Sequence, residues 1–136
     1  MTGSPDGASV YVASGVSDAV GVFDRARDGT LTQKAGTAGC IVNEPSTDIT
    51  GCTNTGLALN GASSVTVSPD GASAYVASQR SDAVAGCDRA AGGTVTQKGG
   101  PAGCIDNETS HAANAGGDTA ATRRAARAAT ATPAWP

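Results

Sequence analysis

Acidic side chains are the residues of this chain best suited to chemistry, and they recur in pairs at one constant spacing along the chain. The pairs, together with one pair of asparagines, are Asp6/Asp70, Asp18/Asp82, Asp24/Asp88, Glu44/Glu108 and Asn43/Asn107. A residue present in both copies of a repeat is more simply explained by a need of the scaffold than by one catalytic site. We therefore predict that these side chains bond to turn and loop backbone. Calcium binding is the alternative, although neither an EF-hand nor a nonapeptide pattern supports it.

Residues for nucleophilic or metal-dependent catalysis are scarce. His111 is the only histidine, and we expect a solvated loop side chain there. The sequence has no GxSxG, P-loop or HExxH motif, so we assign no catalytic, cofactor-binding or metal-binding residue and no cofactor. Asn107-Glu108-Thr109 fits the glycosylation sequon, which is a short and unspecific match.

Two of the four cysteines form a candidate disulfide. Cys40 and Cys52 each follow a glycine in a Gly/Thr/Asn-rich stretch, and we predict a local bridge on a loop outside the sheet, with two free thiols as the alternative. A zinc site is disfavoured because no histidine or CxxC motif accompanies the pair. The bridge would contribute about 3 kcal/mol in the chain-entropy model. It would also indicate an oxidising compartment.

The other two cysteines lack this arrangement. Cys104 matches Cys40, but Gly116 stands where its partner would be. Cys87 takes the place of Phe23, and we predict a small buried hydrophobic residue there. A Cys87–Cys104 bridge stays open, and a redox pair is disfavoured.

An internal repeat must position all these residues. Residues 4–41 and 68–105 agree at 27 of 38 positions without a gap. Each copy opens with a turn signal, in which proline presets φ, aspartate bonds nearby backbone and glycine takes positive φ. The turn residues are Pro5, Asp6 and Gly7 in the first copy and Pro69, Asp70 and Gly71 in the second.

Short strands follow each turn. We expect strands at residues 9–14, 19–24 and 30–34 and, in the second copy, at 65–68, 73–78, 83–88 and 94–98. In the first two of these strands both faces are apolar or small, which fits a sheet covered on both sides. The last strand of each copy alternates and carries Lys34 or Lys98, as an outer edge strand should.

The pattern SPDG-A-x-x-YVAS, then SDAV-x-VFDR, then GTLTQ resembles the YVTN/lactonase-like β-propeller repeat of secreted bacterial proteins. The resemblance covers residues 1–110. It implies an all-β fold of β-propeller-type blades, each a four-stranded antiparallel meander, in an incomplete ring. We expect two repeats at 1–64 and 65–110, with a long loop at 35–62, as a fragment of about two blades. The resemblance also implies an extracellular or cell-envelope location for the parent protein.

Composition limits the remaining classes. Residues 1–110 hold six Lys/Arg against eleven Asp/Glu, a balance that disfavours nucleic-acid binding. No apolar run approaches the roughly 18 residues of a membrane span, and the N-terminus lacks a signal-peptide pattern. Residues 111–136 form an Ala/Thr/Arg-rich tail, which we expect to be disordered or weakly helical. An out-of-frame translation is the alternative for this segment.

Three functions follow from these patterns. We expect a non-catalytic scaffold or binding segment, whose assembled propeller face takes an unknown protein or carbohydrate. The first alternative is a fragment of a 6-phosphogluconolactonase-type lactone hydrolase, for which the resemblance implies central acidic and histidine side chains that we cannot assign here. The second is a truncated or frame-shifted product without its own function. Repeat folds need about three units, so a homo-oligomer that completes a ring is left open.

Overall fold

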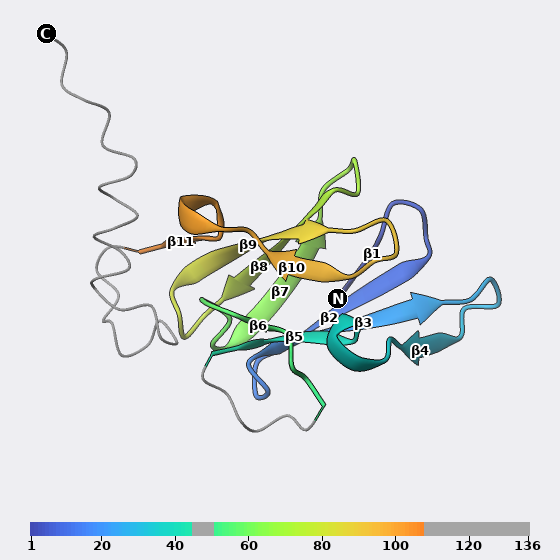
Figure 1. The fold of residues 1–136 in the computed structure, drawn as a ribbon, viewed down its shortest axis with the longest axis horizontal. Helices are drawn as coiled ribbons and strands as arrows, with labels where there is room; N and C mark the ends of the chain where they lie inside the picture. Colours follow the sequence, from blue (N-terminus) through green and yellow to red (C-terminus); the bar gives the residue numbers. More distant parts are fainter. Residues whose placement is uncertain (45–50, 108–136) are drawn as a thin grey trace, which may run out of the picture.

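The computed structural model describes residues 1–44 and 51–107, and these form an all-β fold (Figure 1). The predicted tail at 111–136, with His111, and the Glu108 and Thr109 positions of the sequon lie outside the described residues. The first copy of the repeat contains β1 (Thr2–Gly3), β2 (Ser9–Ser14), β3 (Ala19–Arg25), β4 (Leu31–Gln33), the 3-10 turn η1 (Gly36–Ala38), β5 (Cys40–Asn43) and β6 (Thr55–Gly56). The second contains β7 (Ala62–Val67), β8 (Ser73–Ser78), β9 (Ala83–Arg89), β10 (Val95–Gln97), η2 (Gly100–Ala102) and β11 (Cys104–Asp106).

The two copies fold in the same way. β8, β9, β10 and η2 begin and end at the repeat positions at which β2, β3, β4 and η1 do, and β11 begins at the position equivalent to the start of β5. The predicted strands at 9–14 and 73–78 match β2 and β8, while β3 and β9 run one residue further than expected. β7 starts three residues before the predicted 65–68 strand.

Each copy forms one sheet of a β-propeller type. The second sheet has the order β10-β9-β8-β7, which is the expected four-stranded antiparallel meander, and β11 also pairs with β9. The first sheet has the order β1-β2-β3-β5-β6, and β4 also pairs with β3. All pairs are antiparallel except β5 with β6.

The outer strand of each sheet is divided into two pieces. β4 pairs with the end of β3 at Phe23–Arg25, and β5 pairs with its start at Ala19–Gly21. η1 joins the pieces, and the chain then passes so close to the Lys34 carbonyl that a Cβ on Gly39 would overlap it. Gly103 has the same relation to Lys98 in the second copy. Glycine is therefore required before Cys40 and before Cys104, because any side chain there would overlap the backbone.

The expected long loop at 35–62 is wrong in one respect, because it contains η1, β5 and β6. Cys40 lies in a strand of the sheet and not in a loop outside it. The physical reason is the apolar run at residues 40–42, which pairs with β3 and is buried in the sheet. Such a short run in a Gly- and Thr-rich context gave too little periodicity to identify as a strand.

The two sheets pack against each other and enclose one core. β7 of the second sheet lies along β2 of the first. The core contains mostly small aliphatic side chains and one large aromatic, Tyr11, which is fully buried. Leu59, from the connection between the sheets, is also fully buried. Within the described residues, no helix is long and apolar enough to cross a membrane.

Candidate functional site

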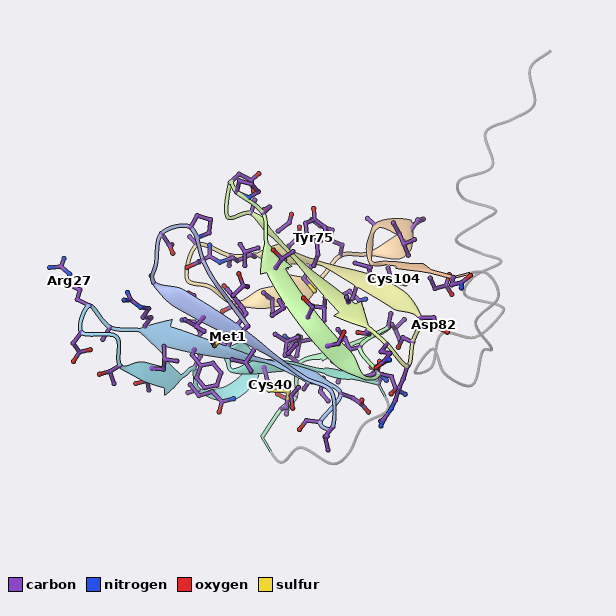
Figure 2. All side chains as sticks on the ribbon, turned by 180° about the vertical axis from the view of Figure 1, so that it is seen from behind. Met1, Arg27, Cys40, Tyr75, Asp82 and Cys104 are labelled. Atoms are coloured by element: carbon purple, nitrogen blue, oxygen red, sulfur yellow. A yellow bond between two sulfur atoms is a disulfide. The ribbon has the colours of Figure 1, made fainter. Side chains whose placement is uncertain are left out.

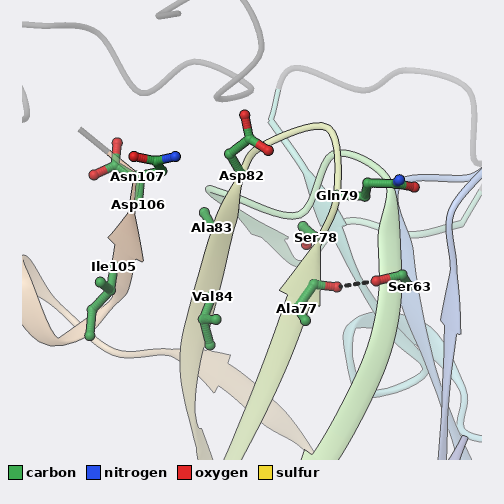
Figure 3. A pocket seen from close by; sticks show the side chains of 10 residues that line it. All are labelled: Ser63, Ala77, Ser78, Gln79, Asp82, Ala83, Val84, Ile105, Asp106 and Asn107. Carbon is green, nitrogen blue, oxygen red and sulfur yellow. Dashed lines mark hydrogen bonds between the residues drawn. The ribbon is translucent and has the colours of Figure 1, made fainter. Parts of the chain in front are cut away.

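A shallow depression of about 420 Å³ lies on the outer face of the second sheet (Figure 3). Its floor is formed by Ala77, Val84 and Ile105, which neighbour one another across β8, β9 and β11. Ser63 borders it and donates a hydrogen bond to the Ala77 carbonyl at 3.1 Å. The remaining lining residues are Ser78, Gln79, Asp82, Ala83, Asp106 and Asn107. The depression therefore has an apolar floor and an acidic and amide rim.

The same positions in the first sheet bind the connection between the two sheets. The counterparts of Asp82 and Asn107 in the first copy of the repeat are Asp18 and Asn43. Asp18 accepts a hydrogen bond from the backbone N–H of Gly61 at 2.7 Å, and Asn43 accepts one from that of Leu59 at 2.9 Å. The first sheet thus uses this site to bind the turn that connects the two sheets.

The backbone at the two sites is also alike. Asp18 and Asp82 both adopt positive φ, at 50° and 47°. The Asp18 carbonyl accepts the N–H of Asn43 at 2.8 Å, and the Asp82 carbonyl accepts that of Asn107 at 2.9 Å. In the first sheet the carboxylate and amide oxygens of this arrangement accept backbone N–H groups, and the second sheet has the same backbone geometry at these positions.

A second polar cluster joins the sheets, and it centres on Tyr11. The Tyr11 hydroxyl donates to the Gly93 carbonyl at 2.7 Å and accepts from Nε of Arg89 at 2.6 Å. Arg89 also donates to the Gly71 carbonyl at 3.0 Å, and its Nη2 lies 3.5 Å from Oδ2 of Asp6. Its guanidinium carbon is 6.0 Å from the centre of the Tyr11 ring. Sequence reasoning did not single out Tyr11 or Arg89, although both recur in the repeat, as Tyr75 and Arg25.

The predicted turn residues occupy equivalent turns. In the first turn, Oδ1 of Asp6 accepts the N–H of Ala8 at 3.0 Å and the hydroxyl of Ser4. These bonds, the Ser4 hydroxyl first, hold the pKa of Asp6 below its usual value. Gly7 has φ of +71° and donates to the Ser4 carbonyl at 2.9 Å.

The second turn repeats this arrangement. Asp70 accepts from the Ser68 hydroxyl and from the N–H of Ala72 at 3.0 Å, and its pKa is lowered for the same reasons. Gly71 has φ of +74°. Pro5 and Pro69 precede the two aspartates in these turns.

The other paired acids also contact the scaffold. Asp24 and Asp88 form ion pairs with Lys34 and Lys98, which lie directly after β4 and β10. Glu44 accepts from the Thr55 hydroxyl at 2.9 Å. Among the described residues, no group of three or more His, Cys, Asp or Glu could hold a metal ion.

Cys40 and Cys52 form a disulfide, with their Cα atoms 5.8 Å apart (Figure 2). Cys87 is buried in the core and is not bonded to Cys104. Burial, and then the negative charge of Asp88, raises the pKa of the Cys87 thiol to about 11. Such a thiol is unreactive at neutral pH, which disfavours a redox role.

No protein-family model matches the chain, and no curated protein sequence matches it. Solved structures do match. A protein from Lactobacillus plantarum superposes with a TM-score of 0.54 and 26% identity over 70% of this chain. A putative 6-phosphogluconolactonase from Bacteroides uniformis superposes with a TM-score of 0.52 and 23% identity over 80% of this chain. The chain spans 25% of the first protein and 29% of the second.

Proposed function

We propose that this chain is a non-catalytic β-propeller segment with a scaffold or binding role in a secreted or cell-envelope protein. The observation that carries the proposal is the use of the duplicated acids. Asp6 and Asp70 stabilise equivalent turns, Asp24 and Asp88 pair with equivalent lysines, and Asp18 binds the backbone of the connection to the next blade. Carboxylates that form these bonds have a structural role, which supports the proposal of a non-catalytic segment.

The Cys40–Cys52 disulfide supports the proposed location. Disulfides persist in oxidising compartments and are rare in a reducing cytosol. The outer surface of the assembled blades would then meet an extracellular partner, a protein or a carbohydrate.

The second candidate function is lactone hydrolysis. It is favoured by one comparison, the putative 6-phosphogluconolactonase from Bacteroides uniformis, and by the resemblance of the repeat. Because the chain spans only 29% of that protein, any such activity would belong to a larger assembly of blades.

A hydrolysis assay separates the two candidates. Purified chain would be incubated with 6-phosphogluconolactone and with simpler sugar lactones, with and without added Mg²⁺, Ca²⁺, Mn²⁺ or Zn²⁺. We expect the rate of lactone loss to equal that in buffer with the same ions, while an authentic lactonase serves as the positive control. Turnover above buffer that is lost in Asp82→Asn and kept in Asp28→Asn, a change in an exposed turn, would overturn the proposal.

A further inference from the structure

Each blade has two different broad faces. In this structure one face of the first blade packs against the opposite kind of face of the second blade, and the other two faces stay uncovered. The face of the first blade that meets the second carries Tyr11, Val20 and Ile41, which are 0%, 1% and 0% exposed. Their counterparts in the second blade are Tyr75, Val84 and Ile105, which are 43%, 43% and 76% exposed. We call the exposed set, with Ala77, the head face. Its side chains are those that form a blade-to-blade contact in the first copy.

The opposite surface of the first blade is equivalent to the surface that the second blade uses in the contact between the blades. In the second blade, Arg89, Gly93 and Val95 contact the first, and Val95 is 2% exposed. The equivalent residues of the first blade are Arg25, Gly29 and Leu31, and Leu31 is 45% exposed. We call these three residues, with Phe23, the tail face. The tail face is thus open in the first blade and occupied in the second.

The tail face already has the conformation that binding requires. Gly29 has φ of +91°, and Gly93, whose carbonyl receives the Tyr11 hydroxyl, has φ of +93°. Arg25 donates to the Gly7 carbonyl at 3.4 Å, as Arg89 donates to the Gly71 carbonyl at 3.0 Å. No rearrangement of the backbone is needed for Arg25 and Gly29 to receive a tyrosine hydroxyl.

We propose that the head face of one chain binds the tail face of a second copy of the same chain. In this contact the Tyr75 hydroxyl donates to the Gly29 carbonyl of the second copy and accepts from its Arg25, while Val84 and Ile105 cover its Leu31 and Phe23. The occupant follows from the repeat, because the tail face is equivalent to the surface of the second blade, at Arg89 and Gly93, that Tyr11 of the first blade already binds. The depression lined by Val84 and Ile105 lies within the head face and is covered by the same contact.

This contact joins two different surfaces, so it is heterologous and leaves one head and one tail open in every dimer. Such contacts give a ring if the rotation closes and an open series if it does not. The contact between copies also lacks the connecting segment that contributes to the contact between the two blades of one chain. Residues 54–61 supply Asn54, Leu57 and Leu59 to the internal contact, and residues 118–125 match them only at Thr119. We therefore expect association between copies to be weaker than packing of the two blades within one.

The test uses substitutions at exposed positions that block one face each. Val84→Lys places a charge on the head face, and Leu31→Lys places one on the tail face. Val16→Lys is the matched control, since Val16 is 94% exposed in the turn between β2 and β3. The full chain and each variant would be compared by circular dichroism and by sedimentation velocity from about 10 to about 500 μM, a range suited to weak association.

The expected mass of the unmodified chain rises above its monomer mass of 13.1 kDa with concentration. Val84→Lys and Leu31→Lys each stay monomeric with an unchanged circular dichroism spectrum, or dissociate with a constant at least about tenfold higher, as for loss of an interface anchor. Val16→Lys associates like the unmodified chain. An equimolar mixture of the two blocked variants forms a dimer and nothing larger, because one intact head and one intact tail remain.

Three results would each overturn the proposal. The first is a chain that stays monomeric over the whole range, which leaves the head face to a further blade or to another protein. The second is association that the two blocked variants leave intact. The third is failure of their mixture to form a dimer, since a head-to-tail contact requires that rescue. None of these outcomes depends on whether the chain hydrolyses lactones, so this test and the enzymatic one fail independently.

Discussion

The phenol of Tyr11 joins the two blades through a single oxygen atom. That oxygen donates to the Gly93 carbonyl and accepts from Arg89, and the Tyr11 residue is 0% exposed. Tyr75 occupies the same place in the repeat but is 43% exposed. The same residue type is therefore buried in one copy of the repeat and partly exposed in the other, because the second blade covers Tyr11.

Removing this oxygen gives the first residue-scale prediction. Tyr11→Phe keeps the ring but leaves Arg89 and the Gly93 carbonyl short of a partner, so the free energy of unfolding should fall by about 1–3 kcal/mol. Tyr75→Phe is the matched control and should change it by less than about 0.5 kcal/mol, because the side chain is partly solvated. Urea unfolding of both variants, at a concentration at which the chain is monomeric, measures the difference. Equal losses in the two variants would contradict this account of the contact.

The Cys87 thiol gives a pH-dependent prediction. Its pKa is raised to about 11 by burial and by Asp88, so the folded state holds its proton more tightly than the unfolded chain does. The resulting stabilisation is complete below the ordinary thiol pKa of about 9 and is lost as pH rises through about 11. We expect the unmodified chain to lose more stability than Cys87→Ala between pH 8 and 11, by up to about 3 kcal/mol at about 1.4 kcal/mol per pKa unit.

Thermal unfolding of the two proteins over this pH range measures the difference, and other titrating groups cancel because they are common to both. A parallel loss in both proteins would show that Cys87 is not responsible. Alkylation of the folded chain at pH 8 gives a second reading, since a thiol with this pKa should react slowly until the chain unfolds.

At the scale of elements, the outer strand of each blade is divided by a 3-10 turn. Gly39 and Gly103 permit the close passage that places β5 and β11 beside the first half of β3 and β9. In the first blade the disulfide then ties β5 to the segment before β6, which pairs with β5 in parallel. The bridge therefore fixes the only parallel pair among the described strands.

Reduction of this disulfide should destabilise the fold. The bridge spans 12 residues, and in the chain-entropy model a loop of this size contributes about 3 kcal/mol by constraining the unfolded chain. We expect dithiothreitol to lower the urea midpoint of the unmodified chain. The double variant Cys40→Ala, Cys52→Ala should start at the lower midpoint and show no further change with reductant. A midpoint of the unmodified chain that is insensitive to reductant would rule out this contribution.

At the scale of the whole molecule, two blades share one core and leave two unlike faces open. The core is formed between the first blade's equivalent of the head face, at Tyr11, and the second blade's equivalent of the tail face, at Val95. The head face itself, at Tyr75, and the tail face itself, at Leu31, remain exposed. Addition of further blades or of further copies would extend the structure in the same direction. The proposed association of copies is thus a property of the repeat as a unit and not of any single residue.

Much of the fold could be predicted from residues. The turn signals at Asp6 and Asp70 and the runs of Val, Tyr and Ala placed the strands β2 and β8 correctly, because those patterns act over a few residues. β5 was missed, since its pairing with β3 depends on how η1 redirects the chain. The inter-blade contact of Tyr11 with Arg89 was also missed, because it joins residues 78 apart in the sequence and nothing local indicates it.

The sequence by itself determined that the chain folds as two equivalent blades, since the repeat carries the same turns and strand patterns twice. It also determined that the acids come in pairs, and thus that each must serve a need present in both blades. Only the tertiary structure decided which copy of each residue is buried. Burial depends on the neighbour that covers a face. The second blade covers Tyr11, whereas the equivalent Tyr75 on the head face is exposed.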